Sequence, residues 1–365
     1  MRHSEQRRTL VALPMAAVAI FILFVAVSAQ AQTYSVLHYF TGGADGGNPV
    51  AGVTVAGPGL LYGTTSGYST SIGNLGTVFK LNQRGSGWIL DPLYVFNGPP
   101  DDAPNGDAPW SGVAVGPNGA LYGTTVSGGV GNGGFGWGTV YEVQPPANAC
   151  KTAICYWSET VLHAFAGGTS DGGFPEFGNV TFDPAGNMYG TGSEEGADAC
   201  GVVWELSPSA SGWTESILYN FQGLDDAQNP VGGLILDQAG NLYGTTFDGG
   251  VNGGGTVYEL SPDGTFTTLY SFSGGYGGPY NKLALDAKGN LYGATNGEAL
   301  YGFGSVFKLS PGSSGWTLTD LYDFANGADG GEPYGSVVVD ASGNVFGTAV
   351  TGGANNQGVF FEITP

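Results

Sequence analysis

A tetrapeptide of the type Leu-Tyr-Gly-Thr occurs six times along this chain, always in the same order with two other patterns. Its copies begin at Leu61, Leu121, Met188, Leu242, Leu291 and Val345. A glycine that opens an alternating β segment follows each copy, at Gly76, Gly138, Gly201, Gly255, Gly304 and Gly358. The third pattern ends in phenylalanine, at Phe40, Phe96, Phe165, Phe221, Phe272 and Phe324. A repeat of this kind constrains the fold strongly, because each unit must bury its apolar face against its neighbours.

Each unit is expected to hold four short strands. The first strand is a β run that precedes the tetrapeptide, such as residues 233–236, and the turn pattern Asp-x-x-Gly-Asn joins the two in four copies. The tetrapeptide is the second strand, the glycine-led segment is the third, and the segment that ends in phenylalanine is the fourth. No stretch beyond residue 31 has a helical period, whereas short β runs alternate with Gly, Pro, Asn and Asp throughout. Sheets repeated radially around a channel avoid long exposed edges. The sequence therefore predicts an all-β, six-bladed β-propeller of four-stranded antiparallel blades.

The two ends of the repeat array are complementary. The array begins with a phenylalanine-ended strand, the fourth of a unit, at residues 34–40. It ends with a glycine-led strand, the third of a unit, at residues 358–363. We expect this N-terminal strand to pair with the last one, so that it completes the last blade and closes the ring.

The first 31 residues differ in composition from the rest. Arg2, Arg7 and Arg8 precede an apolar run over residues 10–27, and the small residues Ala29 and Ala31 follow it. This pattern is typical of a cleaved signal peptide, so we expect residues 1–31 to be removed and the protein to be secreted, periplasmic or held at the cell surface. An uncleaved anchor is the alternative, and the arginine pair does not decide between Sec and twin-arginine export.

Charge and composition narrow the class of protein. The chain has 30 acidic and nine basic residues, a formal net charge of −21 and 13% aromatic residues. Such a charge disfavours binding to nucleic acid or, after signal cleavage, to anionic membranes, and the aromatic content argues against a disordered acidic tail. The 68 glycines are spread evenly and no linker stands out. We therefore expect residues 32–365 to form a single propeller domain, and we expect a monomer.

Three cysteines suit an oxidising compartment. Cys150 and Cys155 lie close together in an insertion, which favours a local disulfide between them. Cys200 as the partner of Cys155 is the alternative.

These units resemble the Gly-rich extracellular repeats of the Gloeobacter/Verrucomicrobia type, which read Leu-Tyr-Gly-Thr-Thr, then Gly-Gly, then Gly-Thr-Val-Phe-Lys-Leu. The resemblance covers residues 34–365, and the full pentapeptide stands at residues 61–65, 121–125 and 242–246. Copies five and six depart from it, at Ala294 and at Val345 and Phe346. The resemblance implies export, tandem repetition and a propeller-like fold, and it implies no established reaction.

Long acidic loops should gather on one face of such a propeller, and binding residues concentrate on such loops. Four of them carry an aspartate four residues before a proline, namely Asp45, Asp171, Asp226 and Asp329. Carboxylates at one height suit Ca²⁺ or sugar hydroxyls, whereas turn formation alone is the alternative. Trp110 and Trp137 lie in or beside loops of this face, where an indole offers a stacking surface for a sugar unless it packs under the loop.

Catalytic signals are weak. His38 and His163 take the place that tyrosine holds in the other fourth strands, which favours packing, so sites built on several His or Cys and Ser-His-Asp triads are poorly supported. Paired loop carboxylates of the kind that hydrolases and lyases use are present, as Asp101, Asp102, Glu194 and Glu195.

We therefore favour a non-catalytic extracellular binding or scaffold propeller, with a carbohydrate or cell-surface partner on the acidic loop face. Asp102 is included among the expected contacts. A carbohydrate-active hydrolase or lyase that uses the loop carboxylates is the alternative, and a purely architectural role is a third. No cofactor other than Ca²⁺ is indicated.

Overall fold

All regular structure in the described residues is β-structure, arranged as six successive antiparallel blade sheets and one two-stranded ribbon. The computed structural model describes residues 37–67, 75–96, 105–129, 136–148, 155–273, 278–297, 299–354 and 356–365. Within this part of the chain, no helix has the length and hydropathy of a membrane span.

Five blades have four strands and the sixth has three. Blade 1 contains β1 (Thr54–Gly57), β2 (Leu60–Thr65), β3 (Thr77–Arg84) and β4 (Gly87–Val95). Blade 2 contains β5 (Ala114–Val115), β6 (Leu121–Thr125), β7 (Thr139–Gln144) and β8 (Ser158–Ala164). Blade 3 contains β10 (Thr181–Phe182), β11 (Met188–Gly192), β13 (Val202–Ser209) and β14 (Gly212–Asn220), and a ribbon of β9 (Gly172–Gly173) and β12 (Glu194–Glu195) lies beside it in sequence. Blade 4 contains β15 (Ile235–Leu236), β16 (Leu242–Thr246), β17 (Gly253–Leu260) and β18 (Phe266–Ser273). Blade 5 contains β19 (Ala284–Leu285), β20 (Leu291–Thr295), β21 (Ser305–Gly312) and β22 (Gly315–Asp323). Blade 6 contains β23 (Val338–Val339), β24 (Val345–Ala349) and β25 (Val359–Ile363).

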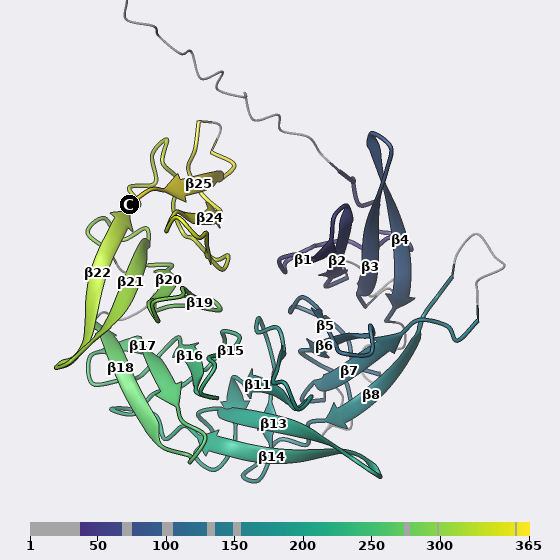
Figure 1. Cartoon of the computed structure of the whole chain (residues 1–365), viewed down its shortest axis with the longest axis horizontal. Coiled ribbons are helices and arrows are strands. Elements are labelled where there is room, and N and C mark those ends of the chain that lie inside the picture. Colours follow the sequence, from purple (N-terminus) through teal and green to yellow (C-terminus); the bar gives the residue numbers. More distant parts are fainter. Residues whose placement is uncertain are drawn as a thin grey trace, which may run out of the picture. The chain divides into compact units, whose positions relative to one another are not determined.

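The blades are arranged around a central channel, with the short first strands innermost and the long fourth strands outermost (Figure 1). Each tetrapeptide forms the second strand, and each glycine-led segment forms the third. The predicted fold class, a six-bladed β-propeller of antiparallel sheets, is confirmed.

The glycine of each tetrapeptide lies under the aromatic ring of the neighbouring third strand. A Cβ atom on Gly190 would stand 2.2 Å from Cζ2 of Trp204, a distance that real Cβ atoms do not show. The same relation joins Gly63 to Phe79, Gly123 to Tyr141, Gly244 to Tyr258, Gly293 to Phe307, and Gly347 to Phe361. Any larger residue at this position would push the ring out of the blade core.

The phenylalanine that ends each fourth strand packs on the same ring in the next blade. Phe165 after β8, for example, has its ring centroid 5.9 Å from that of Trp204 in blade 3. The equivalent pairs are Phe96 with Tyr141, Phe221 with Tyr258, Phe272 with Phe307, and Phe324 with Phe361. These contacts join consecutive blades through buried aromatic surface, which explains why the sequence patterns recur together.

The predicted closure of the ring is only partly realised. Phe40 packs on Phe79 with centroids 5.3 Å apart, so it occupies the place that a preceding blade's phenylalanine takes elsewhere. However, among the described residues Leu37–Thr41 are not in strand conformation, and β23, β24 and β25 have no fourth partner strand. Residues 34–36 of the predicted strand lie outside the described residues, and residues 37–41 contact blade 1 and their own loop.

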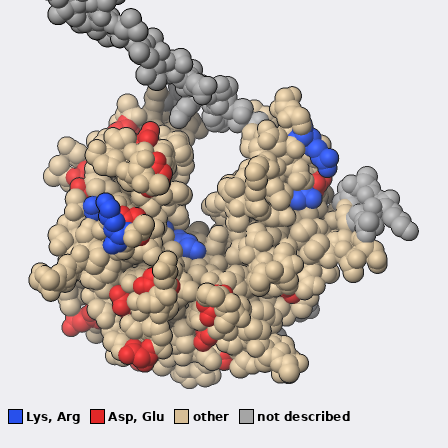
Figure 2. Space-filling view, viewed as in Figure 1, with Lys and Arg blue, Asp and Glu red and all other residues tan. Residues whose placement is uncertain are grey.

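The boundary between blades 6 and 1 is correspondingly open (Figure 2). Val53 is 54% exposed and Phe360 is 70% exposed. Residues equivalent to Val53 in the other blades are at most 4% exposed, namely Val113, Val180, Leu234, Leu283 and Val337. The apolar surfaces of these two blades thus lack the contacts that bury the same positions at the other five boundaries.

Cys155 and Cys200 lie within the described residues. Cys200 is free, so its predicted alternative pairing with Cys155 is wrong. The predicted bond between Cys150 and Cys155 involves Cys150, which lies outside the described residues.

Candidate functional site

The four predicted aspartates occupy four equivalent turns, one in each of four loops. Asp226 accepts hydrogen bonds from the hydroxyl of Tyr219 (2.9 Å) and from the amide of Gln222 (2.9 Å). Asp329 makes the same two contacts, with the Tyr322 hydroxyl and the Ala325 amide. Each carboxylate therefore connects its loop to the preceding fourth strand, and the four do not converge on one point.

Asp45 and Asp171 lie beside a histidine in place of the tyrosine. His38 Nε2 lies 3.1 Å from Asp45 Oδ2, and His163 Nε2 lies 3.4 Å from Asp171 Oδ1. Burial alone raises the pKa of Asp45, but hydrogen bonds from Thr41 and His38 outweigh it and lower that pKa below its ordinary value. These contacts are those expected of turn chemistry. Asp102 lies outside the described residues.

Aromatic side chains from five blades meet near the start of the first strands. We call Trp110, Phe177, Phe247, Tyr280 and Tyr334 the mouth cluster. Trp110 stacks on Phe177 with ring centroids 5.4 Å apart, and Phe177 contacts Tyr280 at 5.2 Å. Tyr280 also contacts Phe247 at 4.9 Å and Tyr334 at 5.7 Å.

The mouth cluster lies at the channel axis. Trp110, Phe177, Tyr280 and Tyr334 each precede by four residues the first paired position of their blade's innermost strand. Side chains from blades 2, 3, 5 and 6 can contact one another only around the axis, because the blades diverge outwards (Figure 1). Tyr334 is 44% exposed, so the cluster presents aromatic surface to solvent.

The loops that lead into the mouth cluster contain residues with a strained backbone. The residue that precedes the loop proline has a left-handed conformation in five blades, with φ between 51° and 57° at Asn48, Ala108, Phe174, Asn229 and Glu332. At Phe174, the amide donates to the carbonyl of Trp137 in blade 2, and the carbonyl accepts from the amide of Ser193. This conformation is uncommon for residues other than glycine and persists only where the surroundings enforce it.

The tetrapeptide threonine holds the next blade's loop. Thr245 in blade 4 donates to the carbonyl of Asn281 in blade 5 at 3.1 Å, and both residues are buried. Blade 5 has Ala294 at the threonine position, and there the Asn281 side-chain amide donates to the Pro333 carbonyl of blade 6 instead. These bonds fix the position along the channel axis of the loops that carry the mouth cluster.

An acidic side chain adjoins the aromatic surface. Glu176 is one extra residue between the loop proline and Phe177, because blade 3 is one residue longer here than the other blades. Burial, and secondarily the charge of Glu194, raises the pKa of Glu176 to about 7. Burial and then the charge of Glu176 raise the pKa of Tyr280. At neutral pH, Glu176 can therefore both donate and accept a proton beside the mouth cluster.

One lysine lies deeper in the channel. Lys282 Nζ donates to Thr181 Oγ1 across the channel at 2.9 Å, and burial lowers the pKa of Lys282 to about 8. A cavity of 470 Å³ includes Lys282, Thr54, Val113 and Asn179 in its lining. The equivalent positions in the other blades are short, namely Gly52, Gly112, Asn179, Gly233 and Ser336. Lys282 is thus the one cationic side chain among the six equivalent positions.

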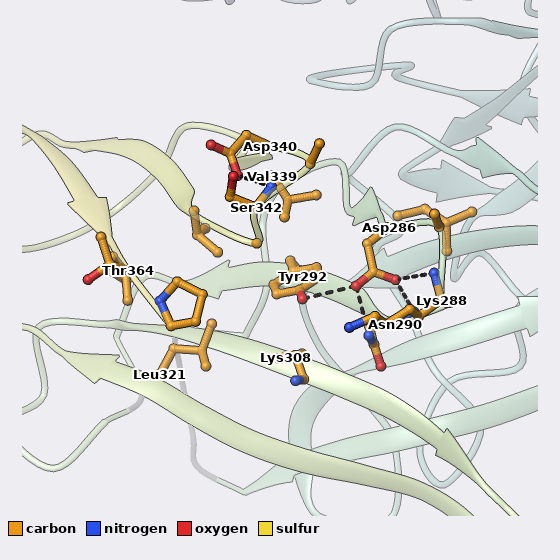
Figure 3. A pocket seen from close by; sticks show the side chains of 17 residues that line it. Asp286, Lys288, Asn290, Tyr292, Lys308, Leu321, Val339, Asp340, Ser342 and Thr364 are labelled. Atoms are coloured by element: carbon orange, nitrogen blue, oxygen red, sulfur yellow. Dashed lines mark hydrogen bonds between the residues drawn. The ribbon is translucent and has the colours of Figure 1, made fainter.

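A second cavity, of 530 Å³, opens between blades 5 and 6 (Figure 3). Its polar groups are largely committed to the turn after β19, where Asp286 accepts from Asn290 and from the Tyr292 hydroxyl. Asp237 in blade 4 makes the same bonds to Asn241 and Tyr243. Because this arrangement belongs to the repeat, the cavity is the weaker candidate for a binding site.

Trp110 is thus placed in the mouth cluster, whereas Trp137 packs on Phe174 with centroids 5.1 Å apart. Sequence reasoning singled out the aspartates and missed Glu176, Phe177, Tyr280 and Tyr334. One sequence signal could have identified this site. The residue just after the loop proline varies between repeats, although the proline itself recurs.

The sequence profile described as the Gloeobacter/Verrucomicrobia repeat matches residues 22–214 and 176–365. The chain belongs to this repeat family. No curated protein matches this member of the family.

Comparison with solved structures found several similar chains at low identity. An ancestral GH74 enzyme is 12% identical, with a TM-score of 0.53 and 84% of this chain and 40% of that chain covered. A PL25 ulvan lyase bound to its sugar is 11% identical, with a TM-score of 0.48 and coverage of 87% and 86%. A Trypanosoma rangeli sialidase in complex with sialic acid is 12% identical, with a TM-score of 0.46 and coverage of 86% and 53%. The repeat protein thus spans less than two thirds of the GH74 enzyme and of the sialidase, and the likeness concerns the fold alone.

Proposed function

We propose that this repeat protein is an exported binding propeller that holds a carbohydrate chain over the mouth cluster. The observation that carries the proposal is the convergence of Trp110, Phe177, Tyr280 and Tyr334 from four blades at the axis. Ring faces pack against the apolar faces of sugars, and hydroxyl and carboxylate groups beside them bond sugar hydroxyls.

The charge of the chain favours a neutral sugar. The formal net charge is −21, and Figure 2 shows acidic side chains spread over several blades with few lysines or arginines. A polyanionic ligand would be repelled by this field. Uncharged polysaccharide segments are therefore the favoured ligands.

The test is a glycan array with residues 32–365, followed by calorimetric titration of the best ligand. Trp110→Ala and Tyr280→Ala should each weaken binding about tenfold, the magnitude expected for loss of one stacked aromatic contact. Tyr156→Ala is the matched control, since Tyr156 is 51% exposed and is not part of the mouth cluster. Unchanged affinity in both mouth variants would refute the proposal.

A second function, hydrolysis or elimination of a polysaccharide, is favoured by one observation. Glu176, with a pKa of about 7, lies near the carboxylate Glu194, and paired carboxyl groups of unequal acidity are what sugar cleavage requires. The assay measures reducing ends and unsaturated products from polysaccharides. Products formed by the wild type but not by Glu176→Gln or Glu194→Gln would establish this activity. If the wild type forms no product even at high concentration, the protein binds sugar without cleaving it.

The prediction of Ca²⁺ binding by the four turn aspartates is untested. Each carboxylate belongs to a different loop and already accepts hydrogen bonds there. Sugar binding by the mouth cluster is therefore expected to be independent of Ca²⁺, and titrations with and without a chelator test this.

A further inference from the structure

A histidine and two carboxylates from two blades come together away from the mouth cluster. His163 lies on β8 of blade 2, Asp171 lies in the following loop, and Glu215 lies on β14 of blade 3. His163 Nε2 stands 3.4 Å from Asp171 Oδ1 and 3.4 Å from Glu215 Oε1. One ligand atom from each of the three lies within 4.8 Å of the others.

The three side chains are held in place, but two of them have a buried atom without a hydrogen-bond partner among the described residues. Asp171 accepts from the amides of Ala166 and Gly172, both at 2.7 Å, so its carboxylate is fixed. The His163 ring packs edge-on against Phe165 at 4.7 Å. His163 Nε2 and Glu215 Oε1 are buried, and neither makes a hydrogen bond of good geometry within the described part of the chain. Buried polar atoms of this kind call for a partner.

The spacing suits a transition metal. Two ligand atoms at about 2.0–2.1 Å from a tetrahedral Zn²⁺ stand about 3.3 Å apart. The observed separations of 3.4 Å from His163 Nε2 match this value. One imidazole nitrogen with two carboxylates is also a donor set that first-row divalent ions accept, whereas Ca²⁺ prefers oxygen alone.

The combination does not recur at the other blade boundaries. Tyr219, which aligns with His163, stacks on Phe266, the residue that aligns with Glu215. His38 pairs with Asp45, but Leu90 in β4 has the register position of Glu215 in β14. At the boundary of blades 1 and 2, Glu159 has the register position of Glu215 and accepts from the hydroxyl of Tyr94, which aligns with His163. A glutamate at this position thus occurs twice, but only at blades 2 and 3 of the described boundaries does it meet a histidine and an aspartate.

We propose that His163, Asp171 and Glu215 bind one divalent transition-metal ion, with Zn²⁺ as the best fit, at the boundary between blades 2 and 3. The ion would connect the two blades and keep at least one coordination position for water. This site is independent of the sugar-binding proposal.

The test uses tag-free protein, freed of metal by a chelator and titrated calorimetrically with ZnCl₂. One ion per chain is expected, and visible absorption of bound Co²⁺ should show a tetrahedral site. His163→Tyr restores the residue of the other fourth strands and Glu215→Leu restores the residue at 90, so both should fold. Each should weaken Zn²⁺ binding at least tenfold.

His38→Tyr is the matched control and should leave Zn²⁺ binding unchanged. Circular dichroism of each variant checks that the fold is intact. Absence of binding, or equal binding by wild type and His163→Tyr, would overturn the proposal and leave His163 as an ion-pair partner of two carboxylates. A preference for Ca²⁺ over Zn²⁺ and Mn²⁺ would overturn the assignment to a transition metal.

Discussion

Replacing Lys282 by methionine should stabilise the protein. Burial lowers the Lys282 pKa from 10.5 to about 8, so the folded state binds its proton less tightly than the unfolded state does. At pH 7 this shift disfavours folding by about 3 kcal/mol, at 1.36 kcal/mol for each pKa unit. Methionine loses the hydrogen bond to Thr181, worth about 1 kcal/mol. The expected net gain at pH 7 is therefore about 2 kcal/mol.

The pH dependence follows from the same shift. Because the folded-state pKa is depressed, the unfolded state holds more protons between pH 8 and 10.5, and the wild type gains stability as pH rises through that window. The unfavourable contribution of Lys282 should fall to about 1 kcal/mol at pH 9.5, where wild type and variant should be nearly equal.

Urea unfolding of wild type and Lys282→Met at pH 7 and 9.5 measures this difference. The exposed Lys288 supplies the control, since Lys288→Met should change stability by less than about 0.5 kcal/mol at either pH. A destabilised Lys282→Met at pH 7, or a difference that does not change with pH, would show that the lysine is not desolvated in the channel.

Other changes test the blade core, the loop attachments and the acid beside the mouth cluster. Gly190→Ala should destabilise the fold by about 1–3 kcal/mol in urea unfolding, because its Cβ would overlap the Trp204 ring, whereas Gly52→Ala has open space and should be nearly neutral. Thr245→Val should cost about 1–3 kcal/mol in the same assay, because it leaves a buried carbonyl without its donor. Glu176 has a raised pKa in the folded state, so its ionisation removes stability as pH rises from about 4.5 towards 7. Glu176→Gln should therefore gain about 3 kcal/mol above pH 7 and nothing below pH 4, and equal gains at both pH values would contradict this.

The sequence predicted the blades well because each recurring residue has a local role. The tetrapeptide glycine leaves space for the ring of the adjacent strand, and the phenylalanine after each fourth strand packs on that ring. Repetition made these roles visible in a single chain. Closure by the N-terminal strand was predicted from the same pattern, but Phe40 docks on blade 1 without pairing of its backbone to β25.

The candidate site was less predictable because it depends on contacts between distant repeats. Phe177 and Tyr280 are 103 positions apart and meet only because their blades face the same axis. His163 was interpreted as a packing residue of its strand, and its position beside Asp171 matches that of the tyrosines in other blades. The approach of Glu215 could not be foreseen, since it comes from the fourth strand of the next blade.

Footprinting by mass spectrometry tests the central claim, that ligand binds at the mouth cluster, where aromatic side chains of five blades meet. Solvent-labelling rates of Trp110, Tyr280 and Tyr334 would be compared with and without the best oligosaccharide from the array. Ligand should slow labelling of these three residues and leave the exposed Tyr156 unchanged. Protection confined to the cavity around Asp286 and Tyr292, with the mouth cluster labelled as before, would contradict the account.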